Sequence, residues 1–337
     1  MLVPMSATAP TLTDYATHSP FSDPGAHADL VRAVAPDPGS LHAAVCDAVV
    51  HYRGFADQLS PEQAGDIDSR WTATILGVLQ DRSAGPLGIG RAVTQKVAGC
   101  CRDHALLAVA TLREHGVPAR SRIGFSGYFR PGFHHDHVVA ERWDGSRWLR
   151  FDPELAPEDW PFDVHDMPTG EGAPFETAAE AWLAIRAGRA DASTYGVDPA
   201  MPWLTGPAFV RTYVGLELAH RMREEVLLWD GWHPELWAAG EPSPDGSASS
   251  GEAPATPADE AAVAAADAVA DEVAELLVTA DRARERGDDA AARQAEAELA
   301  HRYAHDARLR PGGRVLTMSP TGRKGTTDLT ARTTTWA

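Results

Sequence analysis

Cysteine is scarce in this sequence, which excludes a disulfide framework. Cys46, Cys100 and Cys101 are the only cysteines among 337 residues, and a bridge between the two neighbours would strain the peptide between them. Long apolar runs are also missing, because nowhere do about eighteen apolar residues stand together, and the N-terminal segment lacks the pattern of a secretory signal. We therefore expect reduced thiols, no membrane partner and a cytoplasmic location.

Basic residues are also few relative to acidic ones. The chain has 30 Lys and Arg against 48 Asp and Glu, a net charge of −18, and the basic residues are scattered. Because nucleic-acid binding depends on clustered Lys and Arg, we expect no nucleic-acid partner. The acidic, Gly-centred loop of a calcium site is missing too. With 44% hydrophobic residues, the chain has enough apolar material for a large core.

Composition divides the chain into three parts. Residues 1–240 are expected to form one domain with an N-terminal helical extension, around a motif core at 97–155. Residues 241–258 are rich in Pro, Gly, Ser and Ala and lack large apolar side chains, which predicts a disordered linker. Residues 259–337 are expected to form a helical hairpin, which could pack on the domain or bind a protein partner, and a loose polar tail from Met318.

Apolar spacing predicts the elements around the motif core. Helices are expected over 40–55, 68–82, 101–115, 175–188 and 208–229. Strands are expected over 119–129, 136–143 and 147–152, where β-branched and aromatic residues are frequent. The last two strands are joined by Asp144-Gly145, a strong hairpin signal. Helices therefore flank a short run of strands on both sides.

Two adjacent cysteines, Cys100 and Cys101, stand at the predicted start of the helix over 101–115. The thiolate is the reactive form of cysteine, and the unpaired N–H groups of a helix N-terminus lower a thiol pKa. Because successive helical residues turn by about 100°, only one of the two thiols can face a given cleft. The position favours a nucleophile, and a buried, unreactive thiol is the alternative.

The predicted hairpin supplies a base and an orienting acid for such a thiol. With Asp144-Gly145 as a two-residue loop, the register would place His137 directly opposite Asp152, with Cβ atoms roughly 5 Å apart. The carboxylate could then orient the imidazole and stabilise its charged form. A three-residue loop would shift the pairing by one residue and leave a diagonal approach.

Two stretches combine these features: GCCRDHALLAVATLREHGVPARSRIGF at 99–125 and DHVVAERWDGSRWLRFDP at 136–153. Together they resemble the transglutaminase-like superfamily. By that resemblance the nucleophile is Cys101, the base is His137 and the orienting acid is Asp152. The resemblance implies an α+β, papain-like fold, in which the nucleophile helix packs on a small antiparallel sheet with flanking helices and the C-terminal hairpin around it.

Two residues depart from the family pattern. Val139 stands where an aromatic residue is common, and Glu154 stands where threonine is common. Neither change removes a catalytic group. They leave the substrate preference open.

Three further residues are candidates for the cleft. Gln95, six residues before Cys101, could donate its amide N–H to an oxyanion. His135 could line the rim of the cleft, and Trp229 could form an aromatic platform for substrate. A zinc site in the stretch 134–137 is an alternative for the histidines, but the recognised structural spacings are absent. We expect no metal and no cofactor.

The resemblance implies acyl transfer. Cys101 would attack a peptide, amide or acyl-thioester substrate and form a thioester on the enzyme. An amine would resolve the thioester in a transglutaminase-type acyltransferase, whereas water would resolve it in a cysteine protease or amidase. A third hypothesis is a transglutaminase-like binding module without catalysis.

Overall fold

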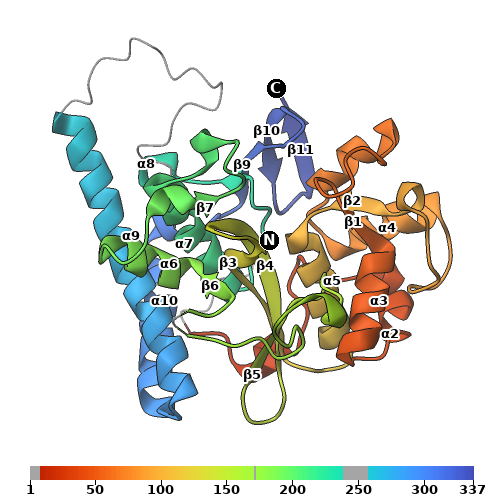
Figure 1. The fold of residues 1–337 in the computed structure, drawn as a ribbon, viewed down its shortest axis with the longest axis horizontal. Helices are drawn as coiled ribbons and strands as arrows, with labels where there is room; N and C mark the ends of the chain where they lie inside the picture. The colour runs from red at the N-terminus through yellow and green to blue at the C-terminus, as the bar shows by residue number, and fades with distance from the viewer. Residues whose placement is uncertain (1–7, 171, 238–256) are drawn as a thin grey trace.

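A small antiparallel sheet lies between two groups of helices in the structure, a computed structural model that describes residues 8–170, 172–237 and 257–337 (Figure 1). Helices from the first hundred residues cover one side of the molecule, and the long C-terminal helices lie along the opposite side. This mixed arrangement confirms the α+β class. Within the described ranges, no helix is both long and apolar enough to cross a membrane.

The elements follow one another along the chain with these bounds. The α-helices are α1 Leu12–Tyr15, α2 Ala28–Arg32, α3 Pro38–Ala48, α4 Thr72–Arg82, α5 Cys101–Glu114, α6 Ala178–Arg186, α7 Pro207–Arg221, α8 Pro234–Trp237, α9 Pro257–Glu285 and α10 Asp289–His305. The strands are β1 Val49–His51, β2 Val97–Gly99, β3 Ala119–Arg130, β4 Phe133–Trp143, β5 Trp148–Phe151, β6 Phe175–Thr177, β7 Tyr195–Gly196, β8 Asp230–Gly231, β9 Arg314–Met318, β10 Lys324–Asp328 and β11 Thr333–Trp336.

The central sheet has the order β5-β4-β3-β6, and β7 adds a short parallel pairing to β4. Apolar residues of α5 and of the sheet share the main core, among them Leu106, Leu107, Ile123, Phe125 and Val138, all at most 1% exposed. Burying side chains of this size contributes roughly 1.5–3 kcal/mol each. The packing fixes α5, and therefore the cysteines at its start, against the sheet.

The register of the β4–β5 hairpin differs from the prediction. Trp143 pairs with Trp148, so the loop has four residues and the pairing is shifted by two. The Asp144 carboxylate accepts hydrogen bonds from the N–H groups of Ser146 and Arg147, and Gly145 adopts a φ of 106°. The predicted two-residue loop was therefore wrong. The longer turn is stabilised by a carboxylate that accepts hydrogen bonds from two loop N–H groups.

Three predicted helices are shorter than expected because strands or loops take over part of their span. The helix predicted over 40–55 ends at Ala48, and β1 pairs in parallel with β2. The helix predicted over 175–188 begins after β6, and the helix predicted over 208–229 ends at Arg221. Almost all of the predicted linker 241–258 lies outside the described residues, and its last two residues begin α9.

The tail from Met318 is a folded sheet, contrary to the expectation of a loose segment. Strands β9, β10 and β11 form an antiparallel meander, and β9 also pairs with β8, which precedes the C-terminal hairpin. Thr317 and Thr327 are fully buried and share a hydrogen bond of 2.8 Å between their hydroxyl groups. These polar threonines are thus interior residues of the sheet. The pairing of β9 with β8 joins the C-terminal strands to the part of the chain that precedes the hairpin.

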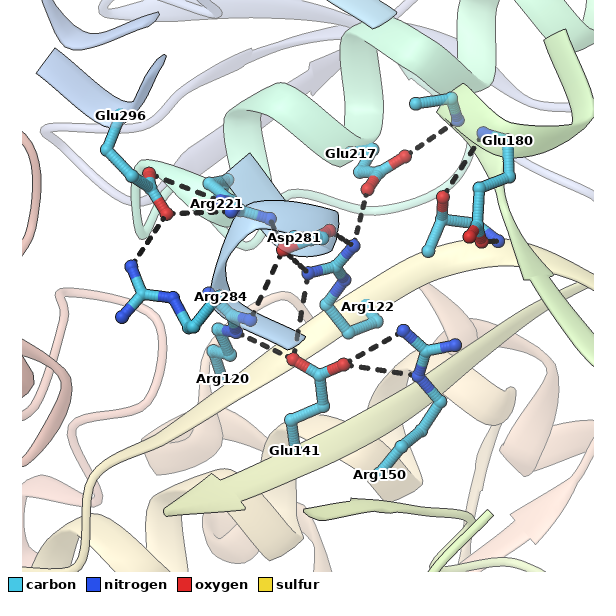
Figure 2. Close-up of polar contacts among 12 residues, drawn as sticks. Arg120, Arg122, Glu141, Arg150, Glu180, Glu217, Arg221, Asp281, Arg284 and Glu296 are labelled. Atoms are coloured by element: carbon cyan, nitrogen blue, oxygen red, sulfur yellow. Dashed lines mark hydrogen bonds and ion pairs between the residues drawn. The ribbon is translucent and has the colours of Figure 1, made fainter. Parts of the chain in front are cut away.

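Buried ion pairs join the hairpin α9–α10 to β3 and α7 (Figure 2). Asp281 of α9 accepts a hydrogen bond from Arg122 (Nη2–Oδ2, 2.6 Å) and pairs with Arg221 (Nη1–Oδ1, 2.8 Å). Arg122 also donates to Glu217 at 2.9 Å, and Arg221 donates to Glu296 at 2.7 Å. The two arginines are only 2% and 1% exposed, so water is poorly placed to replace a lost carboxylate. Whether the hairpin also binds a protein partner stays a prediction.

Candidate active site

The two cysteines lie where β2 passes into α5. Gly99 ends β2 in a place where a side chain would collide, since a Cβ there would lie 2.7 Å from Asp103 Oδ2 and 2.9 Å from Val49 Cγ1. The same Asp103 oxygen accepts a hydrogen bond of 2.9 Å from the N–H of Cys100. Glycine thus allows the tight entry, and the carboxylate favours the positive end of the helix. Cys100 and Cys101 are both 4% exposed.

The surroundings of Cys101 oppose a resting thiolate. The hydrogen bond with the Cys100 side chain, burial, and the charges of Asp136 and Glu154 raise the pKa of the Cys101 thiol well above its ordinary value. The amide dipoles at the start of α5 act in the opposite sense. The helix position alone predicted a lowered pKa for Cys101, but the effects that raise this pKa are larger. Cys101 needs a base to remove its proton.

His137 and Asp152 form a buried pair. The Nε2–H group of His137 donates to Oδ2 of Asp152 at 2.7 Å, and the two residues are 3% and 1% exposed. Burial lowers the pKa of His137, but the charge and hydrogen bond of Asp152 outweigh burial and raise it above the ordinary value. In the observed register Asp152 lies diagonal to His137, and such a diagonal is within reach of long side chains. The ring nitrogen Nδ1 is left to act on a thiol or a substrate.

Tyr128 is a member of this site that the sequence analysis missed. Its hydroxyl donates to the same Oδ2 atom of Asp152 at 2.8 Å, and its ring meets the His137 ring edge to face at 6.0 Å. The N–H of Glu154 binds the other carboxylate oxygen at 3.0 Å. Asp152 is therefore held from three directions. Its burial raises its pKa, but His137 and Tyr128 outweigh burial and lower it.

Replacing Tyr128 by phenylalanine is expected to lower kcat roughly tenfold, because a hydrogen bond to a charged group is lost. The carboxylate would then carry more negative charge toward His137 and raise its pKa further. Since proton abstraction requires a neutral imidazole, the acid limb of the pH–rate profile should move to higher pH. Tyr195→Phe is the matched control, because the Tyr195 hydroxyl bonds Glu176 instead. An unmoved acid limb in Tyr128→Phe would contradict this role.

The thiol and the imidazole are close to the same charges but are not bonded to each other. No hydrogen bond joins Cys101 to His137 within the described part of the chain. Both groups feel the carboxylate of Glu154, which raises the pKa of each. Catalytic hydrogen bonds are often long before substrate binds. The arrangement resembles a catalytic triad. The candidate base His137 and the candidate acid Asp152 are hydrogen-bonded to each other, whereas the candidate nucleophile Cys101 is not bonded to His137.

The three further candidates occupy different positions. His135 lies on the same face of β4 as His137, and both rings meet Phe129 edge to face, at 6.2 and 5.1 Å. Trp229 packs edge-on against Tyr52 and donates its indole N–H to Asp68. Gln95 is exposed, and its side-chain oxygen accepts from the N–H of Ala92. Of the three, only His135 shares a ring neighbour, Phe129, with His137.

The histidine-rich start of β4 alternates between the two faces of the strand. His134 stacks on Tyr195 at 4.4 Å between ring centres, and the hydroxyl of Tyr213 donates to Asp136 at 2.5 Å. The Nδ1–H group of His135 donates to the carbonyl oxygen of Val197 at 3.0 Å. In the ranges that the structure describes, no three His, Cys, Asp or Glu side chains are grouped to hold a metal ion. These side chains have structural partners.

Cys100→Ala is expected to make Cys101 more reactive, because the hydrogen bond with the Cys100 side chain is the largest cause of the raised Cys101 pKa. The pH profile of iodoacetamide labelling at Cys101, followed by peptide mass, should shift to lower pH, and the rate at pH 8 should rise several-fold. Cys46→Ala is the control: that thiol lies on α3, where burial and the charge of Glu154 raise its pKa to about 12. A profile unchanged from wild type would rule out the coupling.

Three comparisons with known proteins bear on this site. The model of the transglutaminase-like superfamily matches residues 69–153, which include all three triad candidates. Among curated proteins, none matches this sequence. A solved structure from Cytophaga hutchinsonii, described there as "a Putative Cysteine Protease", is similar at 18% identity over 45% of each chain, with a TM-score of 0.22. That similarity is too low to carry an argument about this chain.

Proposed function

We propose that this chain is a cysteine acyl-transfer enzyme with Cys101 as nucleophile, His137 as base and Asp152 as orienting acid, because its residues 69–153 match the model of the transglutaminase-like superfamily. The observation that carries the proposal is the buried 2.7 Å hydrogen bond from His137 to Asp152. A carboxylate in this position keeps the imidazole in one tautomer and stabilises its protonated form. We also expect the enzyme to work in the cytoplasm, where thiols stay reduced.

The proposed reaction proceeds in two halves. Nδ1 of His137 takes the proton of the Cys101 thiol, and the sulfur attacks the carbonyl carbon of a peptide, amide or acyl thioester. The bond to the leaving group breaks, His137 returns the proton to that group, and a thioester remains on Cys101. Backbone N–H groups at the start of α5 would stabilise the oxyanion. An amine or water then attacks the thioester.

Intact-mass measurement tests this proposal. The wild-type protein would be incubated with a panel of peptides, simple amides and acyl thioesters, and we expect an added acyl mass on one cysteine, mapped to Cys101 by digestion. Adding a primary amine should release the acyl group as an amide from a transferase, and water alone should release it from a hydrolase. If no member of the panel gives an adduct or loses its leaving group faster than in buffer, the acyl-enzyme mechanism is refuted.

A second candidate, a binding module without catalysis, is favoured by one observation. Cys101 is buried and its pKa is raised, which is typical of an unreactive thiol. This alternative predicts that a reactive acyl thioester adds no mass to Cys101 and loses its thiol no faster than it does in buffer. It also predicts that Cys101→Ala leaves ligand binding unchanged.

A further inference from the structure

Glu154 follows the proposed orienting acid, Asp152, by two residues, and its carboxylate lies 3.9 Å from the ring of His104 on α5. Its backbone N–H is bonded to Asp152, and its charge raises the pKa of both Cys101 and His137. The Glu154 side chain is 20% exposed, whereas Cys101 and His137 are 4% and 3% exposed. Glu154 is therefore an acidic group close to the start of α5 that keeps some access to solvent.

One oxygen of this carboxylate has no hydrogen-bond partner. Oε2 of Glu154 is buried, and among the described residues nothing donates to it. The nearest basic group is Nδ1 of His104 at 3.9 Å. That nitrogen already donates its proton to the carbonyl oxygen of Cys100 at 3.0 Å, because a carbonyl can only accept. The carboxylate therefore has unused capacity to accept a hydrogen bond.

The other acidic groups near the thiols are already engaged. Asp152 holds His137 and Tyr128, Asp103 holds the start of α5, and Asp136 accepts from Tyr213. No lysine or arginine of the described residues forms an ion pair with Glu154. A buried carboxylate oxygen that accepts no hydrogen bond destabilises the protein, and more strongly when the group is charged. A cation supplied by the substrate would offset that destabilisation.

We propose that Glu154 is a specificity residue, and that the substrate carries an ammonium or guanidinium group beside the reacting carbonyl carbon. The proposal rests on the proposed acyl transfer at Cys101. The cation could belong to the acyl group itself, as in an acyl donor with a free α-amino group. It could equally belong to the incoming amine. Both sources present the same chemistry to Glu154, and the two arms of the experiment distinguish them.

The first arm compares two donors of equal shape, the glycyl and propionyl thioesters of N-acetylcysteamine, by kcat/KM for thiol release. The second arm compares two acceptors of equal shape, ethylenediamine and propylamine, by their partition from the propionyl enzyme. Each ratio is measured for wild type, Glu154→Gln and Glu158→Gln. Because the ammonium also changes the intrinsic reactivity of each probe, the change of the ratio between variants is the readout. Glu158 is exposed and serves as the matched control.

We expect one of the two ratios to fall about tenfold in Glu154→Gln and to stay unchanged in Glu158→Gln, since one ion pair is lost. Thermal unfolding checks that the variant is folded, and the backbone bond from residue 154 to Asp152 does not require the carboxylate. Adducts with unchanged ratios in both arms would overturn the role of Glu154 alone. If wild type forms neither a glycyl nor a propionyl adduct on Cys101, the proposed function fails, and this proposal fails with it.

Discussion

Cys101→Ala is expected to abolish the acyl adduct completely, whereas Cys100→Ala retains it. Only Cys101 occupies the first residue of α5, where the backbone N–H groups can stabilise an oxyanion. Cys100 precedes the helix and falls on the variable position of the superfamily pattern. Removing the nucleophile of a thiol enzyme costs many orders of magnitude in rate, because no other group forms the thioester.

Intact mass after incubation with a reactive acyl thioester is the measurement. His137→Ala should give a stable protein that forms the adduct at a greatly reduced rate, because the thiol loses its base. Cys46→Ala controls for labelling elsewhere. If Cys101→Ala gains the same mass as wild type, or if Cys100→Ala alone loses it, the assignment of the nucleophile is wrong.

Asp281→Asn is expected to destabilise the protein by about 3 kcal/mol, because the buried Arg122 and Arg221 lose the carboxylate that they share and keep only their other acidic partners. Asp281 pairs with Arg122 and Arg221 (Figure 2), and its side chain is 21% exposed. The change keeps the shape of the side chain and removes its charge. Urea unfolding of wild type and variant gives the difference.

The effect should depend on pH with a definite sign. The charges of Arg122 and Arg221 outweigh burial and hold the pKa of Asp281 well below its ordinary value of 3.8. A lowered carboxyl pKa stabilises the folded state above the ordinary value, and this stability is lost as the pH falls below it. The difference in free energy of unfolding between wild type and Asp281→Asn should thus be largest at pH 7 and should disappear in acid. Glu298→Gln is the control on α10, where an exposed pair with Arg302 contributes under about 1 kcal/mol.

The order of nucleophile helix, histidine strand and aspartate strand could be read from local patterns. Each depends on residues close in sequence: apolar spacing for α5, β-formers for β4 and β5, and a turn dipeptide between them. The register could not be read in the same way, because the Asp144 side chain stabilises a longer loop than the dipeptide alone requires. His137 and Asp152 still meet, since side chains of their length also reach across the diagonal.

Contacts between distant segments were beyond sequence reasoning. Tyr128 reaches Asp152 across 24 residues, and nothing in the local pattern of β3 distinguishes its hydroxyl from that of a core tyrosine. The strands β9–β11 were missed because their threonines are polar, although β-branched residues favour strands. Glu154 was visible only as a departure from the family pattern. Its place near both thiol and imidazole follows from the tertiary fold.

Strands β8 and β9 bring residues far apart in the sequence into one buried polar cluster. Arg70 donates to both Asp230 of β8 and Thr317 of β9, at 2.9 and 2.7 Å, and all three residues are at most 2% exposed. The backbone oxygen of Arg70 in turn accepts a hydrogen bond from Arg102 of α5. We therefore expect the buried pair of Arg70 and Asp230 to remain accessible to water in any chain that has not yet reached Thr317. A chain that ends before Thr317 would lack one of the buried hydrogen bonds that hold Arg70, the residue on which Arg102 of α5 rests.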